Sequence, residues 1–341
     1  MNNKNIVIVV SALLSIIIFG GVVAWLLYNK ANSSAFGVEE DSFVYIDENK
    51  NYAAVVYQLE EEAGLKDTQF FMKVANVLKY PDNIKVGRYK ITPNMTYLEA
   101  IRLLRSGAQE PVKLTFNNIR LKTDLVNRIG EQLMFTNEEL LALLNDSAVT
   151  ASYGFDTTTI VAMFIPNTYE MYWTVKAADF MDRMHKEYNR FWTKERTDKA
   201  AAINLTPIEV SILASIVEEE TASQSEYPIV AGLYINRLKK GMLLQADPTV
   251  KFAVGDVTLK RILFKHLEVE SPYNTYKYVG LPPGPIRIPS IKGIDAVLNY
   301  KHHPYIYMCA KEDFSGTHNF AVTLAEHNRN AKRYQSALNK R

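Results

Sequence analysis

Three consecutive glutamates, Glu218, Glu219 and Glu220, stand near the end of a segment with helical spacing. At about 100° per residue, only Glu220 points in the mean direction of the segment's apolar residues, which are Ile212, Leu213, Ile216 and Val217. A carboxyl group held among apolar side chains has a raised pKa and can stay protonated, as a general acid must. Glu220 is therefore the first candidate for catalysis, whereas Glu218 and Glu219 are expected on solvated sides of the helix.

A capping sequence marks the start of this helix. Thr206 can cap the first turn, Pro207 suits the first helical position, and Glu209 completes a capping box. The sequence thus predicts a helix over 208–221 that carries Glu220 in its last turn.

A second carboxylate beside Glu220 is not obvious. Glycosidases of the usual kind place two carboxylates on either side of the bond that they break. Asp247 is the nearest candidate in sequence, although Asp-Pro pairs also commonly begin turns. A hydrolase that uses Glu220 with Asp247 or Glu218 therefore stays open.

The segments after this helix carry polar groups that suit a sugar. The stretches 236–238 and 241–249 offer amides, a hydroxyl and one acid, which fit hydroxyl and acetamido groups better than phosphate. Neither a glycine-rich phosphate loop nor a Gly-x-Ser-x-Gly elbow is present. The loops 272–276 and 280–286 add aromatic side chains and a rigid run of prolines and glycines, although structural turns would explain these segments equally well.

The overall composition excludes several classes of protein. Among 341 residues, 39 are basic and 37 are acidic, so the net charge of +2 argues against a strong nucleic-acid binder. The six histidines show no metal-binding spacing, and neither a metal nor a cofactor is expected. The single cysteine, Cys309, excludes an internal disulfide and is expected as a small buried residue in a strand.

The N-terminus predicts a membrane anchor. Ile6 to Leu27 is an uncharged, mostly apolar run of about 22 residues, which is long enough to cross a bilayer as a helix and longer than the core of a secretory signal. Lys4 and Lys30 flank it almost evenly, so the charges do not fix its orientation. We expect a single-span protein of the inner (cytoplasmic) membrane whose remainder lies outside, in the periplasm or the extracellular space.

The elements that must position the candidate residues follow from periodicity and turn signals. We expect an α+β protein with an anchor at 1–28, a linker at 29–41, a small α+β module at 42–108 and a mixed α/β catalytic domain at 109–341. Tyr80, Tyr89 and Tyr97 of the module could stack on sugars or fill its core. The region beyond Gly241 is predicted as loops and short strands before a last helix. The predicted helices are 52–63, 68–79, 96–104, 121–133, 136–145, 176–192, 208–221, 228–240 and 324–338, and the predicted strands include 87–91 and 111–116.

Taken together, these segments resemble the endolytic murein (lytic) transglycosylases of the YceG-like family. The resemblance rests on the motifs at 215–221 (SIVEEET), 235–238 (INRL), 244–249 (LQADPT), 273–276 (YNTY), 280–284 (GLPPG), 318–320 (HNF) and 327–328 (HN). The small module resembles the LysM-like peptidoglycan-binding domain of that family.

The resemblance implies an enzyme that cuts peptidoglycan strands internally, between N-acetylmuramic acid and N-acetylglucosamine, and leaves 1,6-anhydro ends without consuming water. It implies Glu220 as the sole acid and base, which explains the missing second carboxylate. It also implies a role in cell-wall assembly beside penicillin-binding synthases. The expected substrate-binding residues are Glu218, Asn236, Gln245, Asp247, Thr249, Tyr273, Asn274, Tyr276 and His318.

Two positions depart from the family pattern. Asn167 stands where the family usually has aspartate, and Ile288 stands where it often has asparagine. Asn167 keeps the capacity to form hydrogen bonds but loses a charge. A catalytically inactive peptidoglycan-binding scaffold is the remaining alternative, although the presence of Glu220 argues against it.

Overall fold

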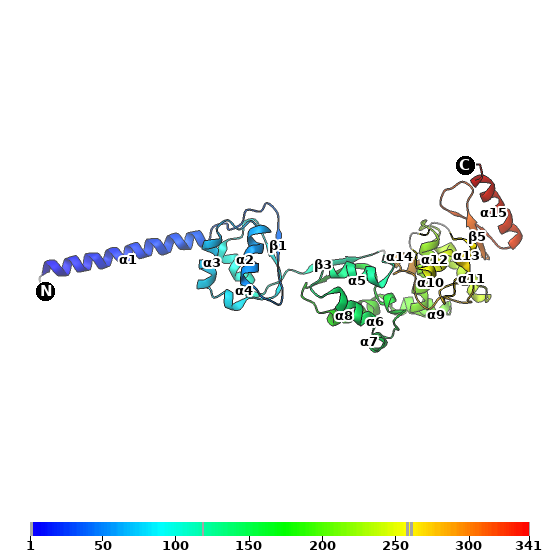
Figure 1. The fold of residues 1–341 in the computed structure, drawn as a ribbon, viewed down its shortest axis with the longest axis horizontal. Helices are drawn as coiled ribbons and strands as arrows, with labels where there is room; N and C mark the ends of the chain where they lie inside the picture. Colours follow the sequence, from blue (N-terminus) through cyan, green and yellow to red (C-terminus); the bar gives the residue numbers. More distant parts are fainter. Residues whose placement is uncertain (1–2, 118, 257–258, 260–261, 341) are drawn as a thin grey trace. The chain divides into compact units, whose positions relative to one another are not determined.

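The computed structural model describes residues 3–340 apart from 118, 257, 258, 260 and 261. It is a mixed α+β structure that begins with an apolar helix, as predicted (Figure 1). The chain divides into two compact units, one of residues 1–113 and 170–174 and one of residues 114–169 and 175–341. The division falls inside two short strands, β3 (Val112–Phe116) and β4 (Asn167–Met171), which pair as a two-stranded sheet.

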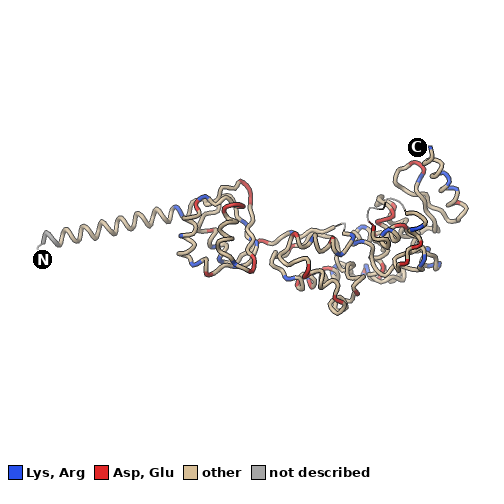
Figure 2. Tube along the Cα trace, in the orientation of Figure 1, with Lys and Arg blue, Asp and Glu red and all other residues tan. Residues whose placement is uncertain are grey.

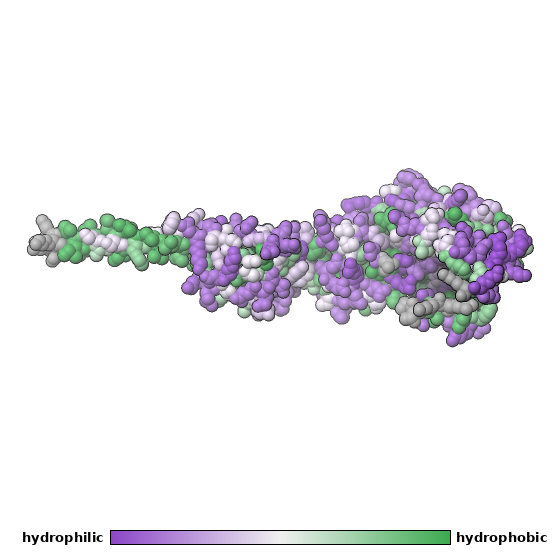
Figure 3. Space-filling model, turned by 90° about the horizontal axis from the view of Figure 1, so that it is seen from above, coloured by the Kyte–Doolittle hydropathy of each residue, from purple (hydrophilic) through white to green (hydrophobic). Residues whose placement is uncertain are grey.

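The first helix, α1 (Asn3–Ala31), has the length and composition of a membrane span. Within Ile6–Ala31, the most apolar stretch of 18 residues has a mean hydropathy of 3.0 and is not buried against the rest of the protein. Apolar residues cover it along most of its length (Figure 3), and no charged residue interrupts its middle (Figure 2). At its end, Lys30 forms an ion pair of 2.6 Å with Asp67.

The first unit is a two-stranded sheet covered by short helices. Strand β1 (Ser42–Ile46) pairs antiparallel with β2 (Gly87–Ile91), so that Ser42 lies opposite Ile91. Between them lie α2 (Tyr52–Glu61), α3 (Thr68–Val77) and the 3-10 turn Pro81–Asn83. Helix α4 (Tyr97–Ser106) follows, with a capping box at Thr96 and Gly107 in the left-handed conformation at its end.

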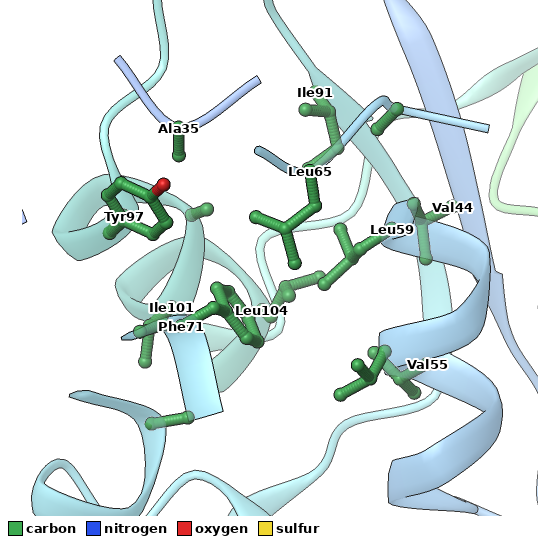
Figure 4. Packing of buried hydrophobic residues seen from close by; sticks show 14 of the residues in the cluster. Ala35, Val44, Val55, Leu59, Leu65, Phe71, Ile91, Tyr97, Ile101 and Leu104 are labelled. Carbon is green, nitrogen blue, oxygen red and sulfur yellow. The ribbon is translucent and has the colours of Figure 1, made fainter. Parts of the chain in front are cut away.

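The core of this unit contains the aromatic residues that could have bound sugars. Tyr80, Tyr89 and Tyr97 are all buried, so they pack the core and do not offer a stacking surface. Figure 4 shows three side chains that belong to the same buried cluster: Leu59 of α2, Leu65 of the segment between α2 and α3, and Ile91 of β2.

The second unit is mainly helical. Figure 1 shows its helices with the small sheet of β5 (Tyr307–Ala310) and β6 (His318–Ala321) near the C-terminal helix. Its helices are α5 (Lys122–Gly130), α6 (Asn137–Asn145), α7 (Ser147–Ser152), α8 (Ala177–Phe191), α9 (Lys194–Ala202), α10 (Pro207–Glu220), α11 (Tyr227–Lys239), α12 (Asp247–Val254), α13 (Phe264–Leu267), α14 (Ile291–Leu298) and α15 (Leu324–Leu338), with a 3-10 turn at Ile160–Met163.

Helix α10 is the centre of this unit. Its N-terminal capping box at Thr206 and Glu209 forms as predicted. It packs against α9, α11, α12 and α14, and every residue from Val210 to Glu218 is buried. The prediction of a single apolar side was therefore wrong, because Ser211, Ala214 and Ser215 are small enough for neighbouring segments to cover the other side as well.

Three helices lie where loops were predicted, namely the four-residue α13 and the longer α12 and α14. The Asp247-Pro248 pair begins α12 instead of a turn, since proline also suits the first turn of a helix. Helix α14 is capped by Ser290, whose side chain accepts a hydrogen bond from the backbone of Gly293. Helices α12 and α14 have eight residues each, a length at which helical periodicity is hard to recognise in sequence.

Candidate active site

Glu220 is the last residue of α10, and its carboxyl group is bound by a buried tyrosine. The hydroxyl of Tyr234, on α11, donates a hydrogen bond of 2.6 Å to Glu220 Oε1. The pKa of Glu220 is raised to about 7, chiefly by burial and to a smaller extent by the nearby charge of Asp247, whereas the hydrogen bond from Tyr234 and the charge of Arg237 oppose the shift. The carboxyl group can thus both donate and accept a proton near neutral pH.

Two pockets meet at Glu220 and Asp247. The first, of about 250 Å³, also has Tyr234, Arg237, Gln245 and Tyr276 in its wall, together with residues of β5 and His318. The second, of about 460 Å³, continues past Glu219, Pro248 and Lys251. Glu220 is only partly exposed, although it lies at the junction of these two pockets. A polymer lying across this point would place one of its bonds beside the carboxyl group.

Arg237 holds the first pocket together from inside the protein. Its guanidinium donates to the carbonyl oxygens of Ile306 at 2.7 Å and Leu244 at 2.7 Å, and to Gln245 Oε1 at 3.3 Å. Gln245 has a positive φ of 51°, a conformation that few residues other than glycine adopt. The arginine therefore fixes Gln245 at the pocket wall and adds a positive charge near Glu220.

Asp247 and Tyr276 form another part of the wall of the first pocket. The Tyr276 hydroxyl donates a hydrogen bond of 2.6 Å to Asp247 Oδ1. The adjacent carboxylate raises the pKa of Tyr276, after the larger effect of burial. Asp247 and Tyr276 therefore lie in the same pocket wall as Glu220 and Gln245, as expected for residues of one site.

Thr249 and Asn274 lie beneath the pocket wall and not on its surface. Both are buried, and Thr249 donates to the carbonyl oxygen of Ala246 at 2.7 Å and lies 2.8 Å from the hydroxyl of Thr275. Asn274 donates to the carbonyl oxygens of Leu267 and Val269. Their polar groups are used within the protein, so they position the segments that carry Gln245, Asp247 and Tyr276.

Asn236 and Tyr273 also lie outside the walls of the two pockets. Asn236 donates to the carbonyl oxygens of His303 at 2.7 Å and Tyr305 at 3.0 Å, and so joins α11 to the segment before β5. The ring of Tyr273 packs against Phe252 of α12 with a centroid distance of 4.7 Å. The structure therefore gives both residues contacts that support the site from a distance.

His318 reaches the first pocket with its ring held by a buried carboxylate. Glu226 is buried, and its Oε2 lies 2.9 Å from His318 Nδ1 and accepts a hydrogen bond of 3.0 Å from Thr221. Its Oε1 accepts from the backbone nitrogen of His318 at 2.8 Å. Glu226 thus links Thr221, the residue after Glu220, to His318 at the start of β6.

The prediction of solvated positions for Glu218 and Glu219 was wrong. Glu218 is buried, and its Oε1 accepts hydrogen bonds from the backbone and the hydroxyl of Ser290. Glu219 forms ion pairs with Arg120 at 2.5 Å and Arg287 at 2.9 Å. Glu218 lies outside the two pocket walls and anchors the start of α14, because α10 is covered on all sides.

Three residues of the site were not among the predicted site residues. Tyr234 and Arg237 are three residues apart on α11, so they share a face of that helix. The arginine within an otherwise apolar helix could have indicated Arg237 as a site residue, whereas nothing in the sequence links Glu226 to His318.

Cys309 lies in a strand, as predicted, but it is half-exposed in the wall of the first pocket and not buried. Within the described residues, no three His, Cys, Asp or Glu side chains are grouped as metal ligands.

Comparisons with known proteins agree with the motifs. The model of the YceG-like family matches residues 44–333. A Bacillus subtilis protein named endolytic murein transglycosylase is 28% identical over 327 residues, which are 89% of this chain and 89% of that protein. A Streptococcus pneumoniae protein of the same name is 25% identical over 331 residues, but the match spans only 59% of its length. A crystal structure of a yceG-like protein from Listeria monocytogenes matches with 27% identity and a TM-score of 0.57, over 86% of this chain and 99% of that one.

Proposed function

The chain belongs to the YceG-like family, and from this premise we propose that it is an endolytic murein transglycosylase with Glu220 as its only acid and base. The relatives from Bacillus subtilis and Streptococcus pneumoniae carry that name. The observation that carries the proposal is the carboxyl group of Glu220, with a pKa raised to about 7, at the junction of two pockets.

The proposed reaction breaks the bond between C1 of N-acetylmuramic acid and O4 of N-acetylglucosamine. Protonated Glu220 donates its proton to the departing O4. The resulting carboxylate then takes the proton of the C6 hydroxyl of the same muramic acid, and O6 bonds to C1. The product is a 1,6-anhydro end, and Glu220 recovers its proton. A pKa near neutrality suits a group that must serve in both directions.

The two pockets support cleavage within a strand. An enzyme that cuts internally needs room for sugars on both sides of the broken bond, and Glu220 and Asp247 belong to both pocket walls. Gln245, Tyr276 and His318 would bind the sugar in the first pocket through amide, hydroxyl and imidazole groups. Asp247 would stabilise the positive charge that develops at C1.

The remaining parts of the chain fit an enzyme that works at a membrane surface. We propose that α1 anchors the protein as a single span, with residues 109–341 outside the cytoplasmic membrane. The β1-α2-α3-β2 order of the first unit is compatible with a LysM-like module that binds peptidoglycan.

A hydrolase of the muramidase type is the second candidate, because Asp247 supplies a second carboxylate in both pocket walls. It would activate water in place of the C6 hydroxyl. The bond between Tyr276 and Asp247 favours the first candidate, since it occupies one oxygen of the carboxylate that would have to take a proton from water.

One digestion separates these proposals. Purified glycan strands are incubated with the full chain in detergent, and the products are weighed. Ends lighter by one water support the transglycosylase, and reducing ends support the hydrolase. If no strand is cut, the protein is a binding scaffold. Glu220→Gln should abolish cleavage while the fold persists, and residual activity in that variant would refute the role of Glu220.

A further inference from the structure

A third cavity, which the proposed reaction does not use, adjoins the second pocket. This cavity, of about 100 Å³, shares Glu219, Pro248 and Lys251 with the second pocket. Its other walls are largely apolar, with Leu121, Phe252 and Ile286. The second pocket thus shares wall residues with both of the other hollows, and Glu220 belongs to the walls of the first and the second.

Lys251 stands where the second and third hollows meet. It lies four residues after Asp247 on α12, so the two side chains share a face of the helix about 6 Å apart along its axis. Lys251 is half-buried, and in the described part of the chain its ammonium group has neither a hydrogen bond nor an ion pair. A half-buried cation without a partner favours an anionic ligand.

The neighbouring charges do not supply that anion. Glu219 already accepts from Arg120 at 2.5 Å and from Arg287 at 2.9 Å. Asp247 accepts from Tyr276. In the wall of the third cavity, Arg120 and Lys251 stand against a single acid, Glu219, so this cavity carries a net positive charge beside its apolar wall.

We propose that Lys251 and the third cavity bind the acidic stem peptide of the muramic acid whose bond is cleaved. This inference rests on the proposed function, because it takes murein as the substrate. The stem peptide is attached through the lactyl group to the same muramic acid whose glycosidic bond would be broken beside Glu220, so it must leave the site close to the catalytic carboxyl group. Its alanine methyl groups suit the apolar wall, and its free carboxylates suit Lys251.

The test compares glycan strands that carry stem peptides with strands from which an amidase has removed them. For Lys251→Met in the full chain, KM for peptide-bearing strands should rise about fivefold more than KM for bare strands. Lys251→Arg should keep the preference, because it keeps the charge. Lys239→Met is the matched control, since Lys239 belongs to none of these three hollows and its loss should leave both KM values unchanged.

Two results would overturn the inference: an equal rise in KM for both substrates, which would mean that Lys251 contacts the sugar, or no rise for either. If the wild type cuts neither substrate, the proposed function fails. The role of Lys251 is then tested separately by measuring how tightly the protein binds each kind of strand. In a Glu220→Gln background, Lys251→Met should then weaken binding of peptide-bearing strands by about the same factor, and equal binding would refute it.

Discussion

The hydrogen bond between Tyr234 and Glu220 gives the sharpest prediction about the site. Tyr234→Phe removes one hydroxyl group and keeps the ring that packs among buried residues. The hydroxyl donates to Glu220 Oε1 at 2.6 Å, a distance typical of a hydrogen bond to a charged oxygen. This bond stabilises the carboxylate over the acid, so its loss must raise the pKa of Glu220.

The size of the effect follows from the strength of such a bond. A hydrogen bond to a charged group contributes about 1.5–3 kcal/mol, and one pH unit corresponds to about 1.4 kcal/mol. The pKa of Glu220 should therefore move from about 7 to about 8–9. Because the protonated form is the acid, activity should persist to higher pH in the variant than in the wild type.

The assay is the pH dependence of kcat/KM on glycan strands, which reports ionisations of the free enzyme. A carbon NMR titration of labelled glutamate, assigned with Glu220→Gln, measures the same pKa without activity. Tyr89→Phe is the matched control, because Tyr89 is equally buried and its hydroxyl donates to the carbonyl oxygen of Lys85 in the other unit. An alkaline limb that stays in place or moves to lower pH in Tyr234→Phe would refute the reasoning.

Three further predictions concern stability, positioning and metals. Because the pKa of Glu220 is raised to about 7 in the folded protein, its contribution to stability is present below about pH 4.5 and is lost as the pH rises through about 7. At pH 8, Glu220→Gln should therefore have a free energy of unfolding about 1–3 kcal/mol higher than that of the wild type, as measured by urea unfolding. Glu226→Gln should lower kcat/KM by about tenfold at every pH measured, because Thr221 and His318 lose a shared carboxylate. Unchanged kinetics would exclude a positioning role for Glu226. A chelator should leave cleavage unchanged, and a loss that zinc restores would contradict the prediction from the histidine spacing.

The helices with clear caps were predictable, and the environment of the glutamates was not. Three helices that begin with capping boxes, at Thr96, Thr136 and Thr206, start within one residue of their predicted positions. The sequence contains no sign, however, that α14 would cover the far side of α10. Glu218 was therefore expected in solvent, although it is buried against Ser290.

Several predicted residues line the candidate site together, but the residues that support them from inside the protein are evident only in the structure. The pKa of Glu220 is raised, as predicted, although the helix is buried on all sides and not on one. Motif matching selected Gln245, Asp247 and Tyr276, which line the pocket, together with Thr249 and Asn274, which lie beneath it. Sequence motifs do not distinguish these two groups, because a buried hydrogen bond and a ligand contact use the same polar residue types.

The central claim is that Glu220 completes the reaction with the C6 hydroxyl of the substrate and without water. Digestion of glycan strands in water enriched in heavy oxygen tests this directly by mass spectrometry of the new ends. We expect anhydro ends that contain no heavy oxygen, and no products at all with Glu220→Gln. Reducing ends that carry one heavy oxygen atom would contradict it and would assign the second carboxylate, Asp247, to the activation of water.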